Sequence, residues 1–224
     1  MALLSGNMLK LIAALSMLLD HMGMLLFPHA TWMRIVGRLA FPLFAFMIAE
    51  GCHYTRNRKR YWGLITVLAA VYQLVYLFVD GSLYFSVLVT FSLAILTVYA
   101  LDRIKTHPGT GSIAVFCGAV AVLWILNSLF TIDYGFWGCM LPVFAALPRR
   151  TRYDRPAIRL LCLAIGLVLL CLDFGGIQIF SLLSLPLMLC YNGKRGKWNL
   201  KYFFYIFYPT HLVVLYLIQM LSGQ

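Results

Sequence analysis

Ionisable side chains lie within the apolar stretches of this sequence, where their types and spacing could do chemistry. A charged group at the centre of a membrane-spanning helix costs about 2.5–3.5 kcal/mol on insertion scales, so it persists mainly where it faces other helices and finds partners. Imidazole, carboxylate and guanidinium groups together can supply a general base, an orienting acid and stabilisation of negative charge. The residues of this kind are Lys10, Asp20, His21, Arg34, Arg38, Glu50 and His211.

Long apolar runs must position these residues. The chain has 224 residues, of which 62% are apolar and 11% charged, whereas soluble domains have about 45–50% and about 25%. We therefore expect an all-α polytopic membrane protein, with residues 1–224 forming one transmembrane domain. About nine transmembrane helices are predicted, with eight to ten as the range because the seventh and eighth could form one re-entrant hairpin. The predicted helices are 9–27, 32–52, 61–79, 84–102, 111–130, 134–149, 157–173, 175–191 and 201–221.

The distribution of basic residues predicts which loops face the cytoplasm. All but three of the 18 Lys and Arg residues fall in the loops after the second, fourth, sixth and eighth predicted helices. The loops after the odd-numbered helices carry Asp80, Asp133 and Asp173 instead. Because cytoplasmic loops are enriched in Lys and Arg, we expect the N-terminus in the cytoplasm and the C-terminus outside. The net charge of +11 is then a topology signal first, and we expect no nucleic-acid partner.

Helix geometry places several candidates at one depth. His21 lies eleven residues beyond Lys10, about 16 Å further along nearly the same face of the first helix. Arg34 and Arg38 are one turn apart on a helix that returns from the outside. These arginines are therefore predicted to share a layer with Asp20 and His21.

The last helix brings a second imidazole to a similar depth. His211 lies about 15 Å along that helix from Lys201, and Tyr208 is its neighbour three residues earlier. Pro42 and Pro209 can kink their helices and free backbone groups toward a cavity.

Each candidate also has a purely structural interpretation. Asp20 could only neutralise one of the arginines, and Arg34 could extend to the outer interface. Lys10 could only flank the first helix at the cytoplasmic boundary, a level that it shares with Glu50. A buried histidine is often no more than a hydrogen-bonding partner between helices. The histidines could also bind a metal, but no H-x-x-x-H spacing is present, so we expect none.

Four stretches of the sequence resemble the TraX family of membrane proteins. They are Leu9–Lys10 leading to Asp20–His21, "RIVGRLAFPLFAFMIAEG" at 34–51, "HYTRNRKRY" at 53–61 and "KYFFYIFYPTHLVVLY" at 201–216. The resemblance is strong over roughly the first 65 residues and the last 25. The family's named activity is N-acetylation of the conjugative pilin subunit, and it is grouped with polytopic acyltransferases that use cytoplasmic acetyl-CoA.

The resemblance implies an acetyltransferase in the bacterial plasma membrane. A basic residue, ten residues and then a histidine form a shared motif of the wider group, and Lys10 and His21 match that spacing. His21 is thereby implied as the catalytic histidine, and acetyl-CoA as the acyl donor. The acceptor is not carried over with the fold. An amine or hydroxyl is expected, on a pilin-like peptide or a cell-surface glycan.

The other candidates receive roles within this hypothesis. His21 would act as the general base or a transient acyl carrier, and Asp20 or Glu50 would orient an imidazole or hold an arginine. Arg34 and Arg38 would stabilise negative charge or bind an anionic acceptor. In this hypothesis His211 and Tyr208 line the tunnel from the opposite side. The CoA phosphates would meet a basic set at the cytoplasmic mouth, consisting of Lys10, Arg56, Arg58, Lys59 and Arg60.

Two other functions are compatible with the same residues. A transporter could bind an ion or a small anion in the buried polar layer, although no inverted repeat is visible in the sequence. A non-catalytic assembly factor for a surface machine is the third possibility. Membrane lipids are expected to surround the chain in every case.

Overall fold

The computed structural model describes residues 3–81, 84–197 and 200–222 of the chain. The side chains of Asp80 and Lys201, which enter the topology prediction, lie outside the described part. Helices account for nearly all of the regular structure. They are α1 (Gly6–Leu25), α2 (Thr31–Gly37), α3 (Ala40–Tyr54), α4 (Arg58–Asp80), α5 (Val87–Thr106), α6 (Thr110–Leu129), α7 (Gly135–Ala146), α8 (Pro156–Phe174), the 3₁₀ helix η1 (Gly176–Leu183), α9 (Ser184–Leu189) and α10 (Lys201–Ser222).

The helices form the predicted all-α membrane fold. Within the described residues, six helices are long and apolar enough to cross a bilayer, with α2 and α3 together making one of them. Three further apolar segments are shorter: Gly135–Ala146, Gly176–Leu189 and Ile206–Ser222. Each predicted helix overlaps one of these nine regions. Gly135–Ala146 and Gly176–Leu189 are too short for a full crossing, whereas α10 as a whole has 22 residues. The number of nine crossings therefore stays a prediction.

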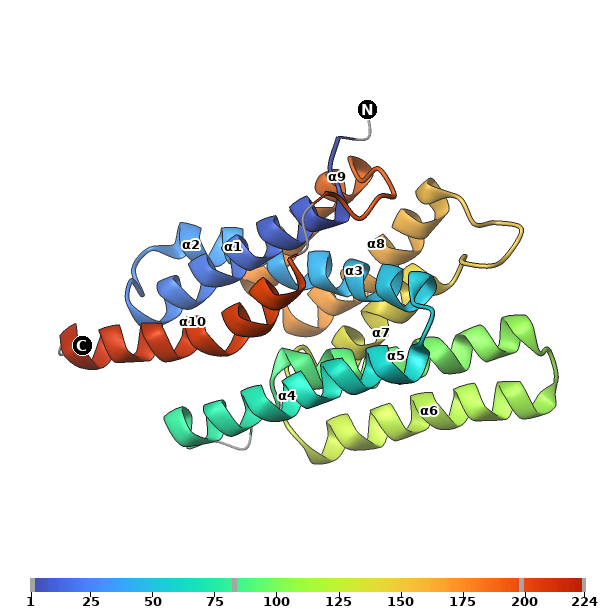
Figure 1. Cartoon of the computed structure of the whole chain (residues 1–224), viewed down its shortest axis with the longest axis horizontal. Coiled ribbons are helices and arrows are strands. Elements are labelled where there is room, and N and C mark those ends of the chain that lie inside the picture. The colour runs from blue at the N-terminus through green and yellow to red at the C-terminus, as the bar shows by residue number, and fades with distance from the viewer. Residues whose placement is uncertain (1–2, 82–83, 198–199, 223–224) are drawn as a thin grey trace.

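The loops lie at the two ends of the bundle. The α5–α6 and α7–α8 connections lie toward one end in Figure 1, and the α1–α2 connection and the C-terminus lie toward the other. The first end carries Arg103, Lys105 and the arginines of residues 149–155. We call it the basic end. This arrangement agrees with the alternation of charge along the sequence.

Helix α3 is the centre of the bundle. It packs against α1, α5 and α7, and in Figure 1 it runs between the α1–α10 pair and the α5–α7 pair. Its sequence is apolar on all faces, which is expected of a helix enclosed by others. Phe41, Leu43 and Ala45 are almost completely buried. By contrast, α4 and α6 expose apolar side chains such as Val67 and Ile125, which are suited to contact with lipid.

The second predicted helix is broken in the middle. Arg38 caps the C-terminus of α2, and Leu39 precedes α3. Pro42 then falls in the first turn of α3, where its missing N–H costs nothing because first-turn N–H groups have no partner within the helix. The break, not a kink at Pro42 itself, places the Arg38 side chain beside α1. Pro209 lies inside α10 as predicted.

Candidate functional site

A cavity of about 370 Å³ lies among α1, the α2–α3 break, η1, α10 and the α6–α7 loop. Its polar lining combines residues that the sequence singled out with several that it did not. Asp20, His21, Arg34, Arg38 and Tyr208 belong to the first group. The second group consists of Tyr72, Tyr76, Tyr84, Ser86, Asp133, Tyr134 and Gln178.

One carboxylate in this cavity binds both arginines. Asp20 accepts hydrogen bonds from Arg34 at 3.0 Å and from Arg38 at 2.7 and 2.9 Å. Arg34 also donates to the Asp20 backbone carbonyl at 3.2 Å. Asp20 therefore holds arginines and does not orient an imidazole, one of the two roles proposed for it. One negative charge between two positive charges leaves this group with a net positive charge.

A glycine allows this close approach. Gly37 faces Asp20 from α2, and a Cβ at that position would overlap the Asp20 carboxylate. Helix α2 can thus pack directly onto α1, which brings both guanidinium groups within reach of Asp20. In the sequence, the only indication of this close packing is the glycine between Arg34 and Arg38.

Two buried N–H groups beside this cluster lack an acceptor. Arg38 donates to the Gln178 carbonyl oxygen Oε1 at 3.4 Å, which ties α2 to η1. Within the part of the chain that the structure describes, Arg38 Nε and Gln178 Nε2 are buried without a hydrogen-bond partner. Buried polar groups are nearly always paired, and these two unpaired donors belong to side chains that line one cavity.

The two predicted histidines are in direct contact. His21 Nδ1 lies 3.0 Å from His211 Nε2, and the ring centroids are 5.1 Å apart. His211 Nδ1 lies 2.8 Å from the backbone carbonyl of Phe207. The Phe207 ring stacks on His211 at 4.9 Å with an interplanar angle of 9°. The contact joins α1 and α10, which run side by side in Figure 1.

Tyr208 is buried against the central helix. It packs on Phe44 at a centroid distance of 5.5 Å and on Tyr72 at 6.4 Å. Its position on α10 next to His211 is the one that the sequence predicted. The Tyr208 side chain forms part of the cavity lining.

The α6–α7 loop supplies a second carboxylate. Asp133 accepts a hydrogen bond from the Tyr84 hydroxyl at 2.7 Å, and its backbone carbonyl accepts one from Thr90 at 2.6 Å. Burial raises the pKa of the Asp133 carboxyl to about 6, while the Tyr84 hydrogen bond and the charge on Arg38 act in the opposite direction. The sequence indicated Asp133 only as a mark of an outer loop, so its place in the cavity was missed.

Glu50 lies outside this cavity. It forms ion pairs with Arg149 and, at 3.3 Å, with Arg159. Asp154 joins Arg159 at 3.2 Å. The sequence hypothesis placed Glu50 among the substrate-site residues, to orient an imidazole or hold an arginine. The structure shows it holding arginines, but in a separate ion cluster at the basic end, between α3, α8 and the α7–α8 loop.

The residues predicted to meet CoA phosphates are dispersed at the basic end. Arg58 pairs with Asp102 at 2.7 Å and lies over the Tyr99 ring. The side chains of Arg56, Lys59 and Arg60 are exposed. These four residues belong to the α3–α4 loop and the first turn of α4, whereas Lys10 lies on α1.

Lys10 stands apart from those four residues on α1 and is half-buried. A basic segment is anchored to the start of its helix by two backbone hydrogen bonds. Gly6 N donates to the Lys194 carbonyl at 2.8 Å, and Asn7 N donates to the Arg195 carbonyl at 2.9 Å. The basic residues nearest to Lys10 therefore come from the α9–α10 connection, which the sequence-based prediction did not include.

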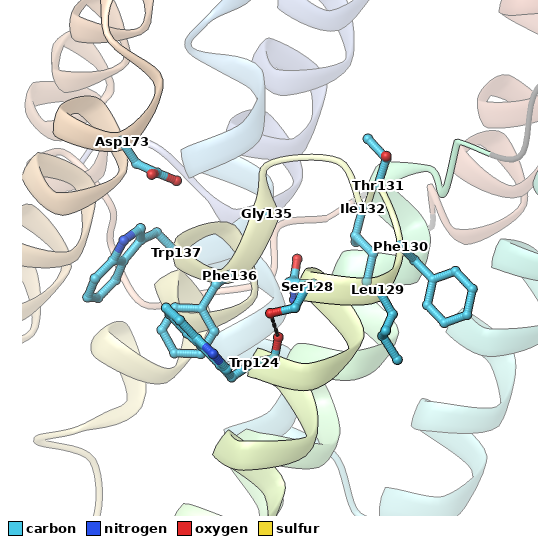
Figure 2. Close-up of a pocket in the computed structure, with 11 residues that line it drawn as sticks. Trp124, Ser128, Leu129, Phe130, Thr131, Ile132, Gly135, Phe136, Trp137 and Asp173 are labelled. Atoms are coloured by element: carbon cyan, nitrogen blue, oxygen red, sulfur yellow. Dashed lines mark hydrogen bonds between the residues drawn. The ribbon is translucent and has the colours of Figure 1, made fainter.

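A second cavity, of about 460 Å³, opens between the end of α6 and the start of α7. Figure 2 shows its aromatic wall of Trp124, Phe136 and Trp137, with Asp173 above and the Ser128 hydroxyl bonded to the Trp124 carbonyl. The described residues that line it include no imidazole, lysine or arginine. Its one carboxylate, Asp173, has no imidazole or cation beside it among these lining residues, so the first cavity is the better candidate for chemistry.

Comparisons with known proteins agree with the resemblance. A family model described as TraX protein matches residues 5–219. The protein TraX of Escherichia coli is 28% identical over 93% of this chain and 85% of its own length. A probable fimbrial assembly protein, FimC of serogroup H1 from Dichelobacter nodosus, is 28% identical over 94% of each chain.

A shorter match is local. An uncharacterised protein of Rickettsia prowazekii is 48% identical over 18% of this chain and 16% of its own length. No solved structure matches the chain.

Proposed function

Since the chain belongs to the TraX family, we propose that it is a membrane-bound acetyltransferase. The donor would be acetyl-CoA from the cytoplasm, and the acceptor an amine or hydroxyl at the membrane. The observation that carries the proposal is the cavity in which His21 lies beside the Asp20–Arg34–Arg38 cluster. The bacterial plasma membrane is the proposed location.

The reaction needs a base and a site for negative charge. The acceptor nitrogen or oxygen attacks the thioester carbonyl carbon, and His21 takes the proton that the acceptor loses. The new C–N or C–O bond forms, the carbonyl oxygen becomes an oxyanion, and the C–S bond then breaks. The CoA thiolate leaves and receives the proton from His21, so that the enzyme returns to its initial state.

The unpaired donors suit the oxyanion. Arg38 Nε and Gln178 Nε2 are N–H groups without an acceptor, and the net positive charge of the arginine cluster favours negative charge nearby. A preorganised donor that reaches the oxyanion is worth about 2.7–4 kcal/mol in acyl transfer, and both donors belong to side chains that line the cavity. Arg38 therefore fits its predicted role of stabilising negative charge, and we propose the same role for Gln178.

The CoA phosphates would meet the basic end of the bundle. Lys10 is the candidate nearest to the path toward His21, because both lie on α1. Lys194 and Arg195 adjoin the start of that helix and would extend the basic surface. Arg56 in the α3–α4 loop and Lys59 and Arg60 in the first turn of α4 are exposed and would be available to the same phosphates.

A non-catalytic role in surface assembly is the second candidate. The name of the Dichelobacter nodosus relative, a probable fimbrial assembly protein, favours it. In that case the cavity would bind part of an assembling subunit without covalent chemistry. Replacement of His21 would then leave assembly intact.

The two candidates separate in an acetyl-transfer assay. Purified protein is incubated with acetyl-CoA labelled in the acetyl group and with bacterial membrane extract, and the label in macromolecules is counted. We expect incorporation with the wild type and with His29→Ala, an exposed loop histidine, and none with His21→Ala. Release of the label by hydroxylamine identifies an ester, and resistance identifies an amide. Equal incorporation by His21→Ala would remove that residue from the mechanism.

A further inference from the structure

The hydrogen bonds of His211 fix where its protons are. A backbone carbonyl can only accept a hydrogen bond, so the 2.8 Å contact between His211 Nδ1 and the Phe207 carbonyl requires a proton on Nδ1. In the neutral imidazole, Nε2 is then the acceptor. The 3.0 Å contact with His21 Nδ1 is therefore a bond in which His21 donates and His211 accepts.

The same reasoning settles the tautomer of His21. With its proton on Nδ1, neutral His21 has its free electron pair on Nε2. His21 lines the cavity, whereas His211 lies behind it with an exposed fraction of 6%. The nitrogen that can take a proton from a substrate thus belongs to the histidine that borders the cavity. The carbonyl, His211 and His21 form one directed chain of hydrogen bonds.

We propose that His211 is a positioning residue that holds His21 in the Nδ1–H tautomer, so that Nε2 is the base toward the cavity. This rests on the proposed function. His211 itself does not touch the substrate. The stacked Phe207 ring and the Phe207 carbonyl fix the plane and direction of His211 from two sides. When His21 takes a proton, its Nδ1–H bond to His211 persists and becomes charge-assisted, which stabilises the cation.

Substitutions at position 211 can separate an acceptor from a merely polar or bulky group. Glutamine can place its carbonyl oxygen near the site of Nε2 and accept the bond from His21. Leucine fills similar space without an acceptor. Lysine supplies only donors, so it forces His21 to accept at Nδ1 and to carry its proton on Nε2. Activity should therefore follow the order histidine, glutamine, leucine, lysine.

The first readout is the kinetics of thiol release from acetyl-CoA. We expect His211→Leu to lower kcat about 10²-fold with KM nearly unchanged, a typical loss for impaired general base catalysis. His211→Gln should keep most of the wild-type kcat. The kcat of His211→Lys should be at least as low as that of His211→Leu. Equal kcat for the glutamine and leucine variants, with both proteins monodisperse by size exclusion, would overturn the proposal.

The second readout does not depend on activity. Nitrogen NMR of protein labelled in its histidine rings reports the tautomer, and the His21 signal is identified by its loss in His21→Ala. We expect Nδ1–H in the wild type and in His211→Gln, and a loss of that preference in His211→Leu. An Nε2–H tautomer in the wild type would overturn this proposal and leave acetyl transfer open. The expected tautomers without thiol release would instead count against the proposed function.

Discussion

The Asp20 cluster and the Glu50 cluster each join a carboxylate to two arginines, and their surroundings differ. Asp20 binds Arg34 and Arg38 on the wall of a cavity that also contains His21. Glu50 binds Arg149 and Arg159 at the basic end, and Arg149 is almost completely buried. The first cluster borders space that a substrate can fill, whereas the second joins α3 to α8 and the α7–α8 loop.

The comparison shows that charge composition alone does not identify a functional site. An intramembrane carboxylate with arginine partners is a functional candidate by default, and by that rule Asp20 and Glu50 are equivalent. What separates them is the cavity that the Asp20 cluster borders together with His21. We therefore expect substitutions at Glu50 to act on stability and substitutions at Asp20 to act on activity.

The largest expected effect is loss of stability in Glu50→Ala. Removal of one partner of a buried ion pair typically costs about 3–5 kcal/mol, and in this variant Asp154 would be the remaining carboxylate beside Arg149 and Arg159. Thermal unfolding in detergent should therefore shift to markedly lower temperature, while the fraction that remains folded should release thiol at the wild-type rate. A stable Glu50→Ala protein without activity would reverse the assignment of the two clusters.

Asp20→Asn should mainly lower activity and have a smaller effect on stability, the reverse of Glu50→Ala. The amide keeps the size of the side chain but removes the charge that holds Arg34 and Arg38, so the guanidinium groups lose their common position. We expect kcat for thiol release to fall about 10²-fold, the lower end of the range for loss of a preorganised electrostatic contribution. The unfolding temperature should change less than in Glu50→Ala. Wild-type kcat in this variant would show that the cluster is structural.

Gly37→Ala tests the close approach on which the Asp20 cluster depends. The added methyl group would overlap the Asp20 carboxylate, and overpacking of this kind costs roughly 1–3 kcal/mol. Gly118→Ala is the matched control, because no side chain lies within 4 Å of that position on α6. Thermal unfolding should show a loss for the first variant and no loss for the second. A neutral Gly37→Ala would mean that α1 and α2 separate easily.

The smallest expected effect is a pH dependence from Asp133. Its folded-state pKa of about 6 is above the unfolded value, so the folded protein binds more protons between about pH 4 and 6. The contribution of Asp133 to the free energy of unfolding is most favourable below that pH window, and it declines as pH rises through about 6. The unfolding temperature of Asp133→Asn, measured relative to that of the wild type, should therefore increase as pH rises from 4.5 to 7. A difference in unfolding temperature between the two proteins that stays constant with pH would contradict this prediction.

The sequence predicted more of the depth of the site than of its contacts. Helix rise and a short loop were enough to place Asp20, Arg34 and Arg38 in one layer, because all three belong to consecutive segments. The contact between His21 and His211 depends on how α10 packs against α1, which depth alone does not determine. The Arg38 position also required the break before Pro42, whereas the sequence allowed only a kink.

Other parts of the site carry no strong sequence signal. Gln178 is a neutral polar residue in an apolar segment, so a search for charges passes over it. Asp133 lies in a loop, where an acid is ordinary, and only the folding of that loop against Tyr84 brings it to the cavity. Glu50 shows the reverse case, because its signal was strong but its partners are distant in sequence: Arg149 in the α7–α8 loop and Arg159 on α8.

The most direct test of the central claim is thiol release from acetyl-CoA by the purified protein, with His21→Ala and His29→Ala measured beside it. Binding of acetyl-CoA is followed in the same samples as a rise in unfolding temperature. We expect all three proteins to bind acetyl-CoA, and only the wild type and His29→Ala to release thiol. Release at the wild-type rate by His21→Ala would contradict the account.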